Sequence, residues 1–391
     1  MRYQFDEIID RKNTGCLKYD AAKFRGVPED DLSLWVADMD FRTAQPIIDR
    51  LKAAADTGIY GYSMAMDGYY RAAADWMEKQ YGWRPDRSWF VLTPGVCFAL
   101  AMMVRAFTAP GEKVLIHQPV YYPFSNVIRE NGRIIETSAL EIRDGHYTVN
   151  FEDFERKVSD PAVRMFILCN PHNPGGRAWS GEEIRRMADL CLRENVLFVS
   201  DEIHADFVWN GRHNSLFLLP EKYRANSIVC TAPSKTFNLA GLQLSNIFIP
   251  NPELRRKFRA AKSATGYDEP NYFGLAACEA AYTEGGDWLS QVKAYIRDNI
   301  LFMRDYFQEN LPMLRMMMPE ATYLVWVDMS ALGFSPEELN DFILHRAKLW
   351  LDDGAIFGKE GAQFERFNAA CPRSVLKKAL DQLASAIKTI S

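Results

Sequence analysis

Short apolar runs alternate with longer amphipathic segments through the middle of the chain. The runs predict strands at 89–92, 113–116, 133–136, 165–169, 197–200 and 228–230, and the amphipathic segments predict helices at 96–108, 122–130, 180–194 and 271–284. Nearly continuous apolar strands between helices are typical of a parallel sheet covered on both faces. We therefore expect an α/β fold built on a mainly parallel mixed sheet.

The pattern changes after Gly285 and Gly286, and it predicts a second, smaller unit. A helical pattern at 288–310 is followed by a strand pattern at 322–328 and helical patterns at 335–348 and 372–390. The first 45 residues show no strong periodicity, and we expect them to pack on this α+β unit. A chain of 391 residues is too long for one compact core. We predict a large domain at 46–285 and a small domain formed by 1–45 and 286–391.

The composition is that of an ordinary globular protein, and it narrows the possible partners. The formal net charge is −5 and no cluster of basic residues stands out, so neither nucleic acid nor an anionic membrane is expected as the main partner. The longest apolar runs are strand-sized, whereas a membrane helix needs ~20 apolar residues. The N-terminus lacks the basic-then-apolar pattern of a secretory signal.

The seven cysteines are scattered, without a C-x-x-C pair, and several lie inside predicted apolar strands. In such strands cysteine behaves as a small hydrophobe. This usage predicts a reduced, cytoplasmic location. The histidines and cysteines never fall at ligand spacing, so no metal site is predicted.

Lys235 is the most informative residue of the chain. It follows the apolar strand predicted at 228–230, and small residues such as Ala232 and Ser234 stand next to it in the sequence. A lysine that is held in a dry turn loses part of its preference for the charged form. Its amine is then suited to forming an imine with a carbonyl group.

Two polar residues upstream of Lys235 also follow predicted strands. Asp201 ends an apolar strand, and Asn173 lies between two prolines in the segment 170–176. A buried carboxylate needs a cationic partner, which the ring nitrogen of pyridoxal phosphate supplies, and the Asn173 amide suits a ring oxygen. His204 either helps to hold Asp201 or the ring hydroxyl, or it is a core histidine. Together these residues predict a site for pyridoxal phosphate.

A glycine turn between a strand and a helix provides a candidate phosphate cradle. Gly95 precedes the predicted helix at 96–108, whose first backbone amides belong to Val96 and Cys97. Helix N-termini of this kind favour anions. Ser234 either donates to the phosphate or turns the chain. Tyr121, on a proline-stiffened loop, is expected to stack on the planar cofactor ring or to pack in the core.

Arg366 is the candidate receptor for the carboxylate of a substrate. It follows a loop rich in glycine and phenylalanine, where an arginine is usually solvated; if it faces the site instead, its guanidinium fork matches a carboxylate with two parallel hydrogen bonds. The segment 35–41, which contains Asp38 and Met39, is apolar and acidic without periodicity. It is expected either to pack between the domains or to line the mouth of the site, with Asp38 and Met39 as substrate contacts.

Together these motifs resemble the pyridoxal-phosphate enzymes of fold type I, and more closely the cystathionine β-lyase-like C–S lyase branch of the class I/II aminotransferase family. The resemblance covers nearly the whole chain. It rests on the segments 35–41, 60–62, 170–177, 201–204, 234–238 and 366–368.

The resemblance implies a role for each matching residue. Lys235 would bind the cofactor covalently, Asp201 would pair with its ring nitrogen, Asn173 would donate to its ring hydroxyl, and Tyr121 would stack on it. Arg366 would bind the α-carboxylate of the substrate. The resemblance also implies that Tyr62 would reach the phosphate bound by a neighbouring subunit. It therefore implies a homodimer with shared sites.

Two positions depart from the wider aminotransferase pattern. Gln243 stands where many relatives have a phosphate-binding arginine, and Ala232 stands where a hydroxyl is common. The phosphate is therefore expected to depend more on backbone amides, Ser234 and Tyr62. His204 replaces a tyrosine common in aminotransferases, so the electronic tuning of the ring is expected to differ.

The resemblance implies a C–S β-lyase that cleaves cystathionine, cysteine or both to a thiol, pyruvate and ammonia. An aminotransferase uses the same lysine, aspartate and arginine, and it remains the first alternative. The second alternative is a regulatory protein that binds a partner on the same fold. A pure binding protein has no chemical need for Lys235, Asp201, Asn173 and Arg366 together, which weighs against this alternative.

Overall fold

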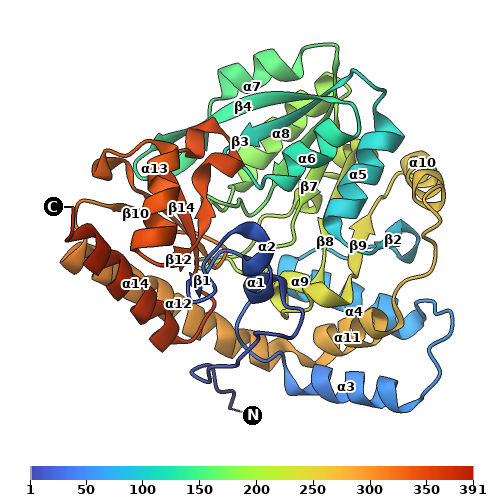
Figure 1. Cartoon of the computed structure of the whole chain (residues 1–391). Helices are drawn as coiled ribbons and strands as arrows, with labels where there is room; N and C mark the ends of the chain where they lie inside the picture. Colours follow the sequence, from blue (N-terminus) through green and yellow to red (C-terminus); the bar gives the residue numbers. More distant parts are fainter. Residues whose placement is uncertain (1, 391) are drawn as a thin grey trace.

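The computed structural model describes residues 2–390, and its centre is an eight-stranded mixed sheet (Figure 1). The strands are β2 (Phe90–Thr93), β3 (Lys113–Gln118), β4 (Ile134–Arg143), β5 (His146–Val149), β6 (Val163–Cys169), β7 (Leu197–Asp201), β8 (Ser227–Thr231) and β9 (Ser245–Phe248). Their order is β2-β9-β8-β7-β6-β3-β4-β5. Strands β8, β7, β6, β3 and β4 pair in parallel, whereas β9 is antiparallel to both of its neighbours and β5 to β4. The predicted mainly parallel mixed sheet is therefore confirmed.

Helices cover both faces of this sheet, among them α5 (Val96–Phe107), α6 (Pro123–Glu130), α7 (Phe151–Val158) and α8 (Gly181–Arg193). Alternate residues of an inner strand pack on opposite faces. In β6, Met165 and Ile167 belong to one core with residues of α5 and α6, while Phe166 and Leu168 belong to the other with residues of α7 and α8. Because both faces are buried, the strand sequence is apolar without interruption.

The candidate functional residues follow strands that end at one edge of the sheet. Strands β2 and β8 are both antiparallel to β9, so they point in the same direction, as do β6 and β7. Asn173, Asp201 and Lys235 therefore stand at a common edge, where Thr93 also ends β2. In α/β sheets, ligands bind outside the carboxyl ends of the strands.

A second, four-stranded antiparallel sheet lies in the C-terminal part of the chain, in the order β10-β11-β14-β13. Its strands are β10 (Arg315–Met317), β11 (Leu324–Asp328), β13 (Asp352–Asp353) and β14 (Phe364–Asn368), and its helices are α12 (Gly286–Asn310), α13 (Pro336–Asp341) and α14 (Arg373–Ile387). The N-terminal β1 (Leu32–Ser33) pairs with β12 (Leu349–Trp350). We keep the division into 46–285 and 1–45 with 286–391 as a proposal.

Several elements were absent from the sequence prediction. They include α3 (Gln45–Asp56) and α4 (Asp67–Tyr81), together with β9. In α3 only Ile47 and Ala54 are buried. The helix expected at 335–348 is instead α13 followed by a π-helical turn at 342–346, and it ends before Lys348, whose φ is 54°.

None of the helices between residues 2 and 390 is both long and apolar enough to cross a membrane. The longest, α12, has 25 residues and carries charged side chains along its length.

Candidate active site

Lys235 lies on α9 (Pro233–Thr236), the short helix that follows β8. Its Nζ donates a hydrogen bond of 2.7 Å to the backbone oxygen of Ala37. Burial lowers the pKa of Lys235, against the opposing charge of Asp38 and with a contribution from Arg366. The neutral amine is the form that attacks a carbonyl or accepts a proton. The surroundings of Lys235 therefore favour its reactive form.

The turn that carries Lys235 is held from two sides. Thr236 donates a hydrogen bond of 2.6 Å from Oγ1 to the buried Asp206 carboxylate. Asn238, with a φ of 58°, accepts from the Met39 amide at 3.0 Å and donates to the backbone oxygens of Met39 and Phe41. A reactive side chain on a turn fixed in this way keeps its position through the reaction.

Asp201 ends β7, and its side chain has the environment expected of a cofactor partner. The residue is 4% exposed, and within residues 2–390 its carboxylate accepts one hydrogen bond, from the Ile203 amide at 3.2 Å. Burial raises the pKa of Asp201 to about 7. A buried carboxyl group with a raised pKa lacks a cation that would stabilise its charged form. The protonated ring nitrogen of pyridoxal phosphate fits this requirement.

The predicted phosphate cradle has the necessary space and donors. Gly95 is the N-cap of α5, and a Cβ atom added to it would meet nothing within 4 Å. The first amides of this 12-residue helix, those of Val96 and Cys97, follow Gly95 at its positive end. The Thr93 hydroxyl bonds the Ser245 hydroxyl at 2.8 Å and holds the turn. Ser234 is half-buried on α9.

Tyr121 and Cys97 lie together beside Asp201 and Lys235. The Tyr121 hydroxyl contacts the Cys97 thiol, and burial raises the pKa of both groups. The Asp201 charge raises the pKa of the Cys97 thiol further, whereas that of Lys235 opposes the shift. The Tyr121 amide donates to the Asn173 backbone oxygen at 3.0 Å. The structure thus brings the residue predicted to stack on the ring next to the one predicted to bind its hydroxyl.

His204 is buried, and its Nδ1 has no hydrogen-bond partner within the described part of the chain. Burial lowers the pKa of His204, with contributions from the charges of Lys235 and Arg366. Within residues 2–390, His204 forms no hydrogen bond with Asp201. A buried, unpaired ring nitrogen beside Lys235 is available to a polar group of the cofactor.

Tyr323 is a site residue that the sequence pattern did not indicate. Its ring lies 5.8 Å from that of His204, and its hydroxyl donates to the Ala37 backbone oxygen at 3.0 Å. The same oxygen accepts the hydrogen bond from Lys235. Tyr323 follows directly after Thr322, whose φ is 68°, and only the fold brings this position to Lys235.

Arg366, in β14, is buried, and its guanidinium is held on several sides. Nη1 donates to the Asn173 Oδ1 at 3.0 Å, and Nη2 donates to the Trp35 backbone oxygen at 2.6 Å and to the Asp352 carboxylate. The Nε group is buried without a partner within residues 2–390. Sequence reasoning missed Asp352, because only the register of β13 on β14 places it opposite Arg366.

The segment 35–41 joins both parts of the molecule through its backbone. Its carbonyl groups accept hydrogen bonds from three side chains of the C-terminal part and from two of the Lys235 turn: Tyr323, Arg366, Asn368, Lys235 and Asn238. The Met39 side chain is buried in the core, and the Asp38 carboxylate pairs with Arg11 at 2.7 Å and with Lys18 at 3.7 Å. Contact of Asp38 and Met39 with a substrate stays a prediction.

Tyr62 does not join this cluster within the chain. It is 98% exposed on the segment between α3 and α4, and it lines a surface pocket with Pro94 and Gln243. Its predicted contact with the phosphate of a neighbouring subunit stays a prediction.

The family model of the class I and II aminotransferases matches residues 30–383. The chain belongs to this family. The chain is 42% identical to the cystathionine beta-lyase PatB of Bacillus subtilis (strain 168), with 98% of this chain and 99% of that protein covered. The family membership and the fold predicted from the motifs are confirmed.

Two solved structures agree closely with the whole chain. Cystalysin from Treponema denticola, which contains pyridoxal 5'-phosphate, has a TM-score of 0.97 at 36% identity and covers 100% of both chains. The pyridoxal-phosphate-bound C–S lyase from Staphylococcus hominis has a TM-score of 0.91 at 31% identity, covering 99% of this chain and 98% of its own. Together with the fit of Asp201, His204 and the Gly95 turn, these likenesses confirm pyridoxal phosphate as the cofactor.

The ion pair of Arg366 with Asp352 leads to a prediction about stability. Replacing Arg366 by alanine leaves the buried Asp352 carboxylate without its cation, and we expect a loss of about 3–5 kcal/mol in the free energy of unfolding. Adding Asp352→Asn should recover most of this loss without recovering turnover. Urea unfolding of both variants measures the free energy of unfolding, and their kcat/KM measures the loss of turnover.

The exposed pair of Lys377 with Asp381 provides a matched control. Lys377→Ala should change stability by less than about 1 kcal/mol, because solvent screens that pair. A double variant no more stable than Arg366→Ala would contradict the role of Asp352 as the buried counter-ion.

Proposed function

We propose that the protein is a pyridoxal-phosphate-dependent C–S β-lyase that cleaves cystathionine, cysteine or both. The products are a thiol (homocysteine or hydrogen sulfide), pyruvate and ammonia. The observation that carries this proposal is that the segment 35–41 holds Lys235 at the Ala37 carbonyl and Arg366 at the Trp35 carbonyl, with Asp201 near Lys235. The lyase activity predicted from the sequence is confirmed by the named relatives, a cystathionine beta-lyase and a C–S lyase.

Residues of this chain account for substrate binding, removal of the Cα proton and cleavage of the Cβ–S bond. Bound pyridoxal phosphate supplies the electron sink for the pair left when the Cα proton departs. Arg366 binds the α-carboxylate and orients the Cα–H bond. Lys235, as the neutral amine, takes the Cα proton, and Asp201 holds the positive charge on the ring nitrogen. The electron pair left at Cα then forms the Cα=Cβ bond while the Cβ–S bond breaks and its pair leaves with the sulfur as a thiolate. Hydrolysis of the released enamine by water gives pyruvate and ammonia.

A product assay tests the proposed activity against its first alternative. Incubation of the holoenzyme with cystathionine, cysteine or cystine should release pyruvate and ammonia in equal amounts, without any added oxo acid. With cystathionine, homocysteine should appear in the same amount. An aminotransferase would instead need an oxo acid, and it would convert that acid to an amino acid. Absent pyruvate together with efficient oxo-acid-dependent transfer would overturn the lyase assignment.

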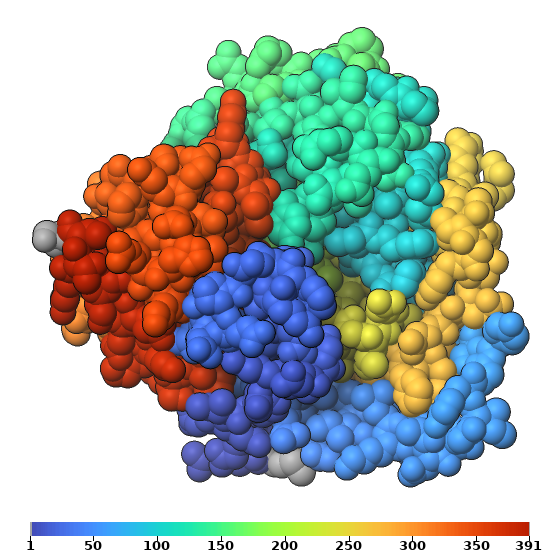
Figure 2. Space-filling view, in the orientation of Figure 1, coloured from blue at the N-terminus to red at the C-terminus, as the bar shows by residue number. Residues whose placement is uncertain are grey.

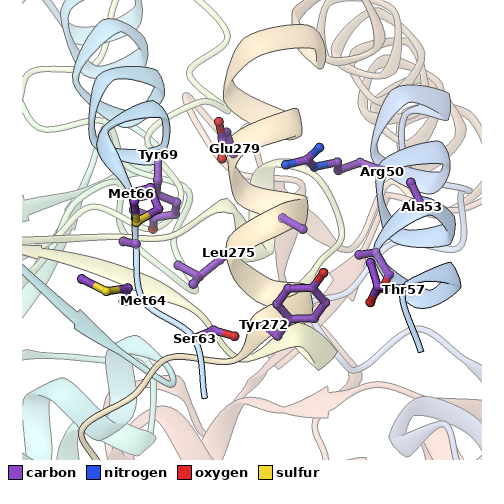
Figure 3. Close-up of a pocket in the computed structure, with 13 residues that line it drawn as sticks. Arg50, Ala53, Thr57, Ser63, Met64, Met66, Tyr69, Tyr272, Leu275 and Glu279 are labelled. Carbon is purple, nitrogen blue, oxygen red and sulfur yellow. The ribbon is translucent and has the colours of Figure 1, made fainter. Parts of the chain in front are cut away.

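We further propose that the protein acts as a homodimer, with a second copy covering the segment 59–66. This segment exposes five large apolar side chains, those of Ile59, Tyr60, Tyr62, Met64 and Met66. It borders a pocket of about 400 Å³ between α3 and α11 (Tyr272–Glu284), lined by Met64, Tyr69, Leu275 and Tyr272 among others (Figure 3). Exposed apolar patches of this kind are typical of protein interfaces.

Mixing two inactive variants tests the sharing of sites. We expect Tyr62→Ala and Lys235→Ala each to be impaired as homodimers. In a mixture with random exchange, half of the dimers are hybrids, and each hybrid has one intact site; about a quarter of the native activity should therefore return. Sedimentation should show twice the 44.8 kDa chain mass. Recovery no greater than the sum of the separate variants would exclude a shared site.

We also propose a cytoplasmic location. All seven cysteines are free thiols, and five of them are buried. An oxidising compartment would favour paired cysteines instead.

A further inference from the structure

Arg25 is a cation near the site, and it forms no salt bridge with an acidic side chain of residues 2–390. It ends the short helix α2 (Ala22–Arg25), its side chain is exposed, and its guanidinium carbon lies 4.6 Å from the centre of the Trp35 ring. No ion pair or hydrogen bond of the Arg25 side chain occurs among residues 2–390. Figure 2 shows the N-terminal segment that carries it (blue) on the front of the molecule, beside the yellow surface near α9.

Trp35 connects Arg25 to the carboxylate site. Arg25 lies on one face of its indole, which also stacks on the Trp350 ring at 4.5 Å. The backbone oxygen of the same residue accepts the hydrogen bond of 2.6 Å from Arg366. The indole Nε1 donates to the Lys18 backbone oxygen at 3.0 Å, so the ring has a fixed orientation. The exposed guanidinium of Arg25 and the buried guanidinium of Arg366 therefore both contact Trp35, whose ring has a fixed orientation.

The neighbouring charges leave Arg25 free to bind an anion. Burial raises the pKa of Asp352 and of Tyr122, and the Arg25 charge opposes both shifts, so Arg25 lies within electrostatic range of these two groups. Asp352 is already paired with Arg366. Asp38 is paired with Arg11 and Lys18 in the same way. The positive charge of Arg25 therefore has no acidic partner among residues 2–390 that is not already paired.

We propose that Arg25 binds a second, distal carboxylate of the substrate, which makes it a specificity-determining residue. The proposal deepens the lyase function and rests on it. A thioether such as cystathionine carries a carboxylate at the far end of its chain, whereas cysteine carries only the one that Arg366 is expected to bind. A guanidinium fork matches that carboxylate in charge and geometry. Arg25 would thus favour long, dicarboxylic thioethers over short substrates.

Two substrates that differ only in charge test the proposal. S-(3-carboxypropyl)-L-cysteine has the distal carboxylate, and S-(3-carbamoylpropyl)-L-cysteine has a neutral amide of the same size. For an exposed ion pair we expect Arg25→Ala to lower kcat/KM for the acid by about fivefold and to leave that for the amide unchanged. Lys23→Ala, which removes an exposed cation of the same helix, should change neither value. Arg25→Lys should keep part of the preference.

A binding measurement separates failure of this proposal from failure of the lyase function. 2-Aminosuberate has a methylene group in place of the sulfur, so it cannot be cleaved, and 2-aminooctanoate lacks its distal carboxylate. Calorimetric titration of the holoenzyme should show a loss of about fivefold in affinity for 2-aminosuberate alone in Arg25→Ala. A wild-type protein that cleaves no thioether yet shows this loss would overturn the lyase function only. Equal effects on acid and amide, or no effect on either, would overturn the role of Arg25.

Discussion

Replacing Lys235 by alanine is expected to reduce lyase turnover by about 10³-fold or more, because the variant loses both the covalent tether of the cofactor and the base for the Cα proton. The purified variant should also be colourless or release its cofactor readily. Borohydride treatment of the native protein should attach the cofactor to the peptide that contains residue 235, and this mass should be missing from the variant. Turnover, the visible spectrum and peptide mass analysis measure these effects.

Lys262 provides the control for this experiment. Lys262 is buried, and burial lowers its pKa as it does that of Lys235, but it lies on α10 (Pro252–Ser263) and donates to the Asp268 backbone oxygen at 3.1 Å. Lys262→Ala should keep the colour and the turnover of the native protein. A Lys235→Ala variant that binds the cofactor covalently, or that turns over at the native rate, would exclude Lys235 as the reactive amine.

Asp201→Asn is expected to lower kcat by about 10²- to 10³-fold while stabilising the protein without its cofactor. The loss of turnover follows because the neutral amide cannot hold a positive charge on the ring nitrogen. The gain in stability follows because the native carboxyl is buried with one neutral donor, and burial raises its pKa to about 7. At pH 8 the folded cofactor-free protein must keep this group ionised, at a cost on the order of 4 kcal/mol.

The sign of the pH dependence follows from the raised pKa. Between pH 7 and pH 4 the folded, cofactor-free protein binds a proton at Asp201 that the unfolded chain does not. Its stability should therefore rise as the pH falls through this window. Asp201→Asn should remove this part of the pH dependence, and urea unfolding from pH 4 to pH 8 measures it. The exposed Asp189→Asn is the control. If the stability of the native protein and that of Asp201→Asn depended on pH in the same way, the buried Asp201 carboxyl would have to be compensated by another charge.

The main sheet and the principal cofactor candidates were predictable because they depend on local signals. An apolar run that ends in a polar residue marks a strand end, and parallel strands present such ends at one edge. Lys235, Asp201 and Asn173 were found in this way, and the structure brings them together with Arg366. Helix α3 was missed although its sequence is amphipathic, and only Ile47 and Ala54 among its residues are buried.

The sequence by itself determined the family and the parallel sheet, and it singled out Lys235 as the candidate reactive lysine, because these depend on residue types at fixed spacing. Only the tertiary structure decided how the site is held. The carbonyl groups of the segment 35–41 accept the side chains of Lys235 and Arg366, and backbone oxygens have no signature in a sequence. In the same way, the pairing of Arg366 with Asp352 depends on the register of two antiparallel strands, which residue types do not encode over such short lengths.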